Sequence, residues 1–118
     1  MKISIAQKLS QINEHWSPNI IGELNGQHVK LAKLKGEFVW HHHENEDELF
    51  MVIEGNLIIE FRDKTVELAP GEICIIPKGV EHKPVAEHEV SVLLFEPATT
   101  LNTGNTQNHF TKNNLTKI

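Results

Sequence analysis

Three histidines and one glutamate are the residues of this sequence with the clearest capacity for chemistry. His41 and His43 stand two positions apart, Glu48 follows after four residues, and His82 comes much later in the chain. Side chains two positions apart in an extended strand project from the same face, so His41 and His43 can face one site while His42 points away. Three imidazoles and one carboxylate form a donor set that suits a divalent transition metal.

Nitrogen and oxygen donors alone do not select among Fe, Mn, Co, Ni, Cu and Zn, so the sequence predicts a site without identifying its ion. Glu48 has two open roles, as a fourth ligand or as a proton acceptor, which also makes it the candidate catalytic residue. The remaining histidines have no partner at such a spacing, and we expect them on the surface: His15, His28, His88 and His109.

The segments around these residues explain how they can meet. Residues 44–47 are polar and suit a turn, and Glu48 opens the apolar run 49–53 that stops before Gly55. A carboxylate at the start of a returning strand can face the histidines that precede the turn.

The order of Gly36, His41-x-His43, Glu48 and Gly55 resembles the first sequence motif of the cupin superfamily. The gap between Gly36 and the first histidine is one residue shorter here than is usual for that motif. The resemblance is carried by the spacing of the histidine pair, the glutamate and the glycine that follows them.

A second stretch resembles the second cupin motif. Gly71 is followed after five residues by Pro77-x-Gly79-x-x-His82. The asparagine that usually stands three positions after this histidine is replaced by Val85. The matched region, 36–95, is about half of the chain, and two motifs in the right order are far more specific than one. The sequence is therefore identified by resemblance as a small single-domain cupin.

The resemblance implies an all-β fold of the cupin type, a double-stranded β-helix or jelly-roll barrel. It assigns His41, His43, Glu48 and His82 as metal ligands. Cupins with similar motifs include dioxygenases, isomerases and decarboxylases, whereas others store or sense small ligands, and small cupins commonly form homodimers through exposed strands. A homodimer that binds a small-molecule ligand or substrate is the expected assembly.

The hydrophobic pattern independently favours many short strands with regular turns, as in a sandwich or barrel. Asn25-Gly26 is a strong signal for a two-residue hairpin turn. The β-prone segments are residues 20–24, 29–34, 38–43, 49–53, 57–62, 65–68, 73–76 and 90–95.

The two ends of the chain differ from the middle. Ile5, Leu9 and Ile12 recur at helical spacing after a possible N-cap at Ser4, which predicts a short outer helix closed by residues 16–18. We divide the chain into an N-terminal helical segment (1–18), the barrel (19–97) and a polar C-terminal tail (98–118). The tail has few apolar residues, so we expect it to be loose or to form an arm against a partner subunit.

Composition excludes several classes of function. The formal charge is −5, and the 11 Lys and Arg residues are scattered, which disfavours binding to nucleic acid. No apolar stretch approaches the ~20 residues that span a bilayer, and the first residues lack the apolar run of a signal peptide. Cys74, the only cysteine, lies in an apolar run and is expected to be a buried, inert thiol. A cytoplasmic protein fits best.

Two hypotheses of function remain. In the first, the chain is a metal-dependent enzyme that acts on a small oxygen-ligating substrate, with dioxygenase-like or isomerase-like chemistry. In the second, it is a non-catalytic binding or sensing module whose metal is structural.

Overall fold

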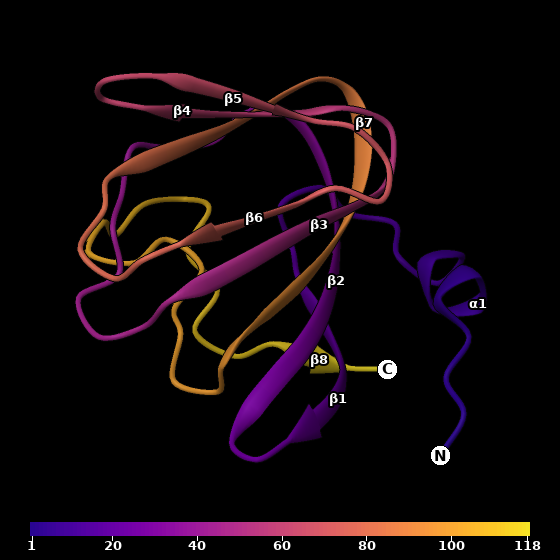
Figure 1. Ribbon diagram of the computed structural model, residues 1–118. Helices are drawn as coiled ribbons and strands as arrows, with labels where there is room; N and C mark the ends of the chain where they lie inside the picture. Colours follow the sequence, from indigo (N-terminus) through magenta and orange to yellow (C-terminus); the bar gives the residue numbers. More distant parts are fainter.

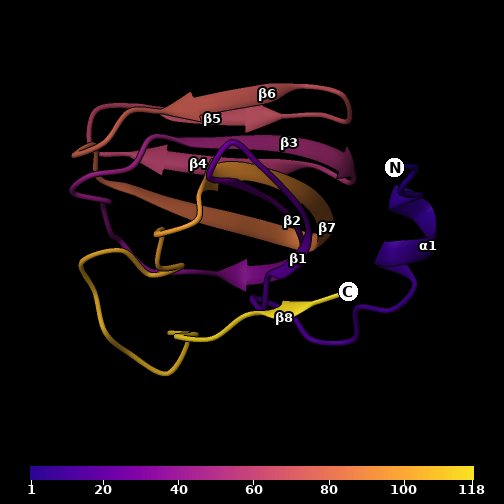
Figure 2. The ribbon, with the colours of Figure 1, turned by 90° about the horizontal axis from the view of Figure 1, so that it is seen from below.

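The computed structural model describes residues 1–118 as one short helix and a set of mostly antiparallel strands that form two layers (Figures 1 and 2). The elements are α1 (Ile5–Leu9), β1 (Asn19–Leu24), β2 (Gln27–Glu37), β3 (Glu48–Glu54), β4 (Leu57–Phe61), β5 (Thr65–Leu68), β6 (Ile73–Ile76), β7 (His82–Pro97) and β8 (Thr116–Lys117). This confirms the predicted all-β jelly-roll architecture with a short N-terminal helix. None of its helices has the length and apolar character needed to span a bilayer.

Two long strands connect the layers. The first part of β7 pairs with β4, from His82↔Phe61 to Val85↔Ile58. Its last part pairs with β3, for example Phe95↔Leu49, and β2 follows β7 along most of its length. The strands β2 and β7 therefore bend from one layer into the other, and the space between the layers holds the core.

The core is built from the inward side of the strand alternation. Val52, Leu57, Ile59 and Val92 are completely buried and belong to a cluster of 13 buried apolar residues. At about 25 cal/mol per Å² of apolar surface removed from water, this burial is the main stabilising contribution to such a fold.

The predicted hairpin between the first two strands is confirmed. Leu24 pairs with Gln27, and the two residues between them, Asn25 and Gly26, have φ angles of 51° and 78°. Positive φ at both central residues is the geometry of the type I′ turn, which matches the twist of the flanking strands.

The N-terminal helix is shorter than its periodicity predicted. Ser4 caps it by accepting a hydrogen bond from the backbone of Gln7, but the helix ends at Leu9 instead of near residues 16–18. Trp16 has φ of 58°, is buried and stacks on Phe38 with ring centroids 4.7 Å apart. The burial of this indole against the barrel overrides continuation of a helix with weak local signals.

Two predicted strands differ from those observed. Residues 38–43 were expected to form a strand, but they make only one isolated bridge, between His41 and His82. The segment 90–95 is the end of β7, a much longer strand that starts at His82. The prediction that His41 and His43 face the same inner side still holds, because side chains alternate along an extended backbone even without a full ladder of hydrogen bonds.

The C-terminal segment is not a loose tail. Residues 116–117 pair with β1 in parallel, and Phe110 packs against Trp16 and Phe38. Asn105 exchanges two hydrogen bonds with the backbone of His42, at 2.9 and 3.0 Å. Residues 98–118 thus fold onto their own barrel and hold the histidine segment. Composition did not reveal this because backbone hydrogen bonds and a polar side chain, Asn105, make many of these contacts.

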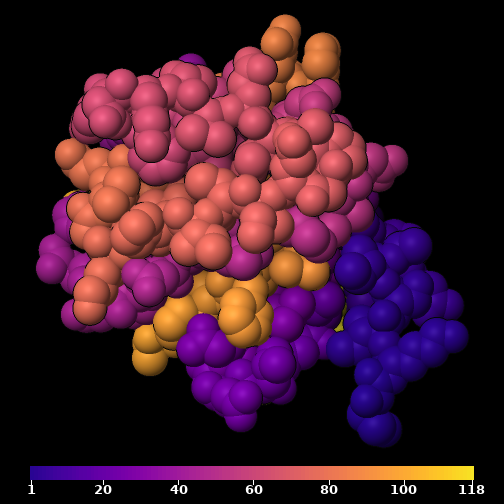
Figure 3. Space-filling model, viewed as in Figure 1, coloured from indigo at the N-terminus to yellow at the C-terminus, as the bar shows by residue number.

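One apolar surface faces outward. The edge strand β6 pairs with β3 alone, and Ile73 and Ile75 on it are 52% and 61% exposed. Their cross-strand partners are Met51 and Leu49. Figure 3 shows the N-terminal segment beside these strands and not over them. The homodimer stays a prediction, and this face offers exposed apolar strands of the kind on which that prediction is based.

Gly104→Ala tests the packing of the C-terminal segment. A Cβ at Gly104 would lie 2.2 Å from the carbonyl oxygen of His42, and the residue has φ of +55°. Gly71→Ala is the matched control, because Gly71 also has positive φ but no atom within 4 Å of its Cβ position. We expect Gly104→Ala to lower the free energy of unfolding by about 2 kcal/mol more than the control in urea denaturation. Equal losses would contradict the described contact.

Candidate metal centre

The structure brings the four predicted residues together at one end of the barrel interior. One ligand atom from each of His41, His43, Glu48 and His82 can be chosen so that all four lie within 4.8 Å of one another. The exposed fractions of these residues are 2%, 3%, 4% and 0%, respectively. A buried cluster of three imidazoles and a carboxylate is suited to a metal ion.

Backbone pairing accounts for the meeting of the two motifs. The N–H of His41 donates to the carbonyl of His82 at 3.1 Å, and the N–H of His82 donates back at 2.9 Å. Gly79 donates to the carbonyl of His43 at 2.8 Å, which ties the second motif to the histidine pair. Glu48 enters from the first residue of β3. Three separate segments therefore fix four side chains.

Hydrogen bonds set the tautomers of two imidazoles. Nδ1 of His41 lies 2.9 Å from the carbonyl oxygen of Val39, and Nδ1 of His82 lies 3.0 Å from that of Val80. A carbonyl oxygen can only accept, so each Nδ1 carries a proton, and in the neutral form of either ring the lone pair available to a metal is on Nε2. Backbone carbonyls that orient imidazoles in this way are typical partners of metal-ligating histidines.

His43 completes the cluster with unused nitrogens. Neither ring nitrogen has a hydrogen-bond partner although both are buried, and its Nε2 lies 3.6 Å from Oε2 of Glu48. Nε2 of His82 lies 3.2 Å from the other oxygen of Glu48. Buried polar atoms without partners are costly, and a cation between these groups would satisfy Nε2 of His43.

The electrostatics favour donors that are free of protons. Burial, together with the neighbouring His82 ring, lowers the pKa of His41 to about 4. Burial opposes ionisation of Glu48, but the adjacent His43 and His82 rings outweigh it and hold the pKa of this carboxyl well below its usual range. His41 is therefore neutral and Glu48 ionised at neutral pH, the forms in which both bind metals.

The geometry fits a first-row ion. Bonds of about 2.1 Å place the donors of one ion roughly 3 to 4.2 Å apart, close to the observed spread. His41, His43, Glu48 and His82 are thus the residues that can hold it.

A cavity of about 40 Å³ lies beside the cluster, with room for about three water-sized groups. Most of its walls are apolar, and they come from the barrel strands and from the segments that flank them. The lining residues include Trp16, Leu34, Phe38, Phe50, Val92 and Leu94, together with the polar His41, Glu48, Glu96 and Asn102.

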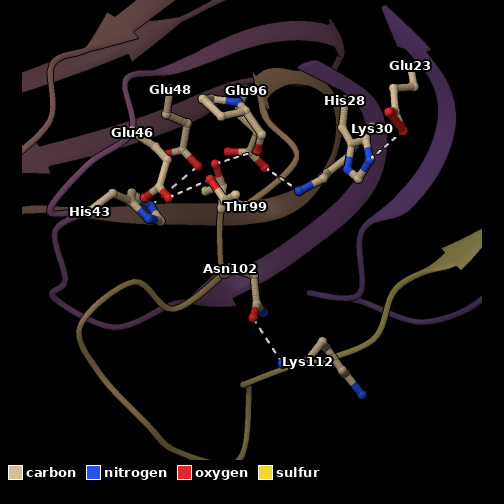
Figure 4. Close-up of polar contacts among 12 residues, drawn as sticks. Glu23, His28, Lys30, His43, Glu46, Glu48, Glu96, Thr99, Asn102 and Lys112 are labelled. Carbon is tan, nitrogen blue, oxygen red and sulfur yellow. Dashed lines mark hydrogen bonds and ion pairs between the residues drawn. The ribbon is translucent and has the colours of Figure 1, made fainter. Parts of the chain in front are cut away.

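Glu96 and Lys30 belong to this site and were missed from sequence. Figure 4 shows Glu96 between Glu48 and Lys30, whose ammonium lies 2.8 Å from Oε1 of Glu96. Burial and the negative charge of Glu48 raise the pKa of Glu96 well above its usual range despite Lys30. Strand alternation could have predicted the position of Glu96, because every second residue of a strand faces the same side and Val92 and Leu94 face inward.

The other histidines lie outside the cluster. His42 points away and its Nε2 lies 2.8 Å from Glu44, while His15, His88 and His109 are exposed. The surface prediction was wrong for His28, whose side chain is only 12% exposed because it packs beside the C-terminal segment.

Cys74 was expected to be buried but is only half-buried, because it lies on the edge strand β6, and its side chain contacts the core. Burial raises the pKa of its thiol. This agrees with an unreactive role, since the thiolate is the nucleophilic form.

Comparison with known proteins agrees with the fold and the motifs. The sequence model of the cupin domain family matches residues 27–96. The crystal structure of a cupin-2 domain protein from Shewanella frigidimarina is 50% identical and covers 80% of this chain and 93% of its own, with a TM-score of 0.79. Protein NMB1881 from Neisseria meningitidis is 33% identical, with 83% and 100% coverage and a TM-score of 0.77.

A curated relative, the uncharacterized protein YdbB of Bacillus subtilis, is 42% identical over 82 residues, which cover 69% of this chain and 70% of YdbB. These relatives carry no described activity in their names. The match extends over more than half of this chain and includes both histidine motifs. The chain is therefore a member of the cupin domain family.

Proposed function

We propose that this cupin binds one divalent transition metal through His41, His43, Glu48 and His82 and acts as an enzyme on a small substrate that ligates the ion through oxygen. The observation that carries the proposal is the convergence of these four buried side chains beside a cavity. A bound ion would supply Lewis-acid activation of substrate or dioxygen, in isomerase-like or dioxygenase-like chemistry.

The charge of the site supports an oxygen ligand. Three neutral imidazoles and one carboxylate leave a divalent ion with a net charge of about +1, which attracts an enolate, carboxylate or phenolate. The four residues are buried and the cavity walls are mostly apolar, which strengthens this attraction. Within the site, Glu48 either holds the ion or accepts a proton from the substrate at a carboxylate oxygen.

The first prediction concerns metal content. Untagged protein purified without chelator or added metal should contain about one divalent transition metal per chain. The variant His41→Ala/His82→Ala should contain none, because it keeps only two of the four donors. Plasma mass spectrometry with protein quantification measures both.

His42→Ala is the matched control, since His42 is adjacent in sequence but points away from the cluster. It should retain the wild-type metal content. Wild-type protein that carries no metal and takes none up on titration would contradict the proposal.

The second prediction separates an enzyme site from a structural metal. The 13-residue apolar core does not include the four donors, so the fold should survive removal of the ion. After chelation we expect an unchanged far-ultraviolet circular dichroism spectrum. The melting temperature should fall only by the amount that metal binding to the folded state had added. Unfolding at 25 °C on chelation would favour the alternative, a binding module with a structural metal.

The third prediction concerns pH. In the unfolded chain His41 titrates near 6.5, but in the folded metal-free protein its pKa is about 4. Between these values the unfolded state holds a proton that the folded state lacks. The stability associated with neutral His41 is therefore complete above about pH 6.5 and is lost as the pH falls toward 4, by up to about 1.4 kcal/mol per pH unit.

Urea denaturation at several pH values in the presence of chelator measures this slope. His41→Gln should make the slope shallower between pH 4 and 6.5, whereas His88→Gln, at an exposed position, should leave it unchanged. Equal slopes for wild type and His41→Gln would show that His41 does not titrate as described.

A further inference from the structure

Glu96 is a charged side chain of the cavity that the four metal donors do not explain. It lines the same cavity as His41 and Glu48, and only 2% of the residue is exposed. A carboxyl group at such a position is costly to bury unless its oxygens find partners.

Only one of its oxygens has a partner of opposite charge. Oε1 accepts a hydrogen bond of 2.8 Å from Lys30, and the side chains of both residues are 2% exposed. No N–H or O–H donor of the protein reaches Oε2, although this atom is buried. Its polar neighbour is the carboxyl group of Glu48, which interacts with Glu96 as well as with His43 and His82. A metal bound to Glu48 would compete for that carboxyl group, so that Oε2 of Glu96 could pair with a ligand instead.

The rest of the cavity supports a role in recognition. Trp16, Phe38, Phe50 and Leu94 form much of its wall and offer no hydrogen bond inside it. Lys30 on β2 forms an ion pair with the carboxyl group of Glu96 on β7. This ion pair holds the carboxyl group in place before a ligand enters. Apolar walls with a small number of fixed polar groups are the usual construction of a selective small-molecule site.

We propose that Glu96, held by Lys30, hydrogen-bonds a hydroxyl group of the bound molecule, so that the site selects oxygen-ligating substrates with a hydroxyl next to the ligating oxygen. This inference rests on the proposed metal-binding function. A hydroxyl both donates and accepts, so the contact does not depend on whether Glu96 carries a proton. Small 2-hydroxy acids and vicinal diols are the substrate classes that fit.

Two small probes isolate the hydroxyl. Glycolate and propionate have the same charge and nearly the same size, and differ by a hydroxyl in place of a methyl group. Titration of each into cobalt-loaded protein, followed by the visible absorption of the ion, gives its dissociation constant. We expect wild-type protein to bind glycolate up to about tenfold more tightly, the effect of one additional hydrogen bond.

The variants assign this preference to Glu96. Lys30→Met/Glu96→Leu removes both buried charges together at similar volume, which avoids leaving one of them unpaired. Its glycolate-to-propionate ratio should fall to about one, with propionate binding unchanged. Glu96→Gln retains a group that can donate and accept, so it should keep the preference. Glu67→Gln, on an exposed position of β5, is the control and should match wild type.

Circular dichroism and cobalt content verify that each variant is folded and loaded. The inference is overturned if wild-type protein shows no preference for glycolate, or if folded Glu96→Gln loses that preference. It is also overturned if the preference survives in the folded double variant, because glycolate would then be favoured only by chelating the ion. Wild-type protein that takes up no metal would overturn the proposed function and this inference together. Wild-type protein that takes up cobalt without a preference for glycolate would overturn this inference alone.

Discussion

The pair of backbone hydrogen bonds between His41 and His82 is the contact on which the site depends. It is an isolated bridge between residues far apart in the chain, one in the connection between β2 and β3 and the other at the start of β7. The same bridge sets the two rings side by side, with centroids 4.3 Å apart. Together with the hydrogen bond from Gly79 to His43, it joins the two segments that contribute the histidines of the cluster.

The bridge is supported from both sides. On one side β7 continues from His82 into its pairing with β4, so the second motif ends directly at the sheet. On the other side, Asn105 of the C-terminal segment forms hydrogen bonds with the backbone of His42. Phe110 of the same segment packs against Trp16 and Phe38. The histidine segment lacks a regular strand ladder of its own, and these contacts replace it.

Polar groups inside the barrel are arranged as a continuous series. The imidazoles of His43 and His82 flank Glu48, the carboxyl of Glu96 follows, and Lys30 ends the series. Each buried charge is costly by itself, and the neighbours of opposite sign or with hydrogen-bonding capacity offset that cost. This arrangement concentrates strong electrostatic interactions beside a cavity with apolar walls, where they act with little screening by water.

The sequence by itself determined the strand-rich fold, the hairpin at Asn25-Gly26, and the four residues that could hold a metal, because alternation and motif spacing are local properties. Only the tertiary structure decided the course of residues 98–118, the burial of Trp16 and the pairing of Glu96 with Lys30. Their contacts join residues distant in sequence, and the C-terminal segment uses polar groups that composition cannot distinguish from a solvated tail. Parity placed Glu96 on the inner face, but its partner depended on which strand lay beside β7.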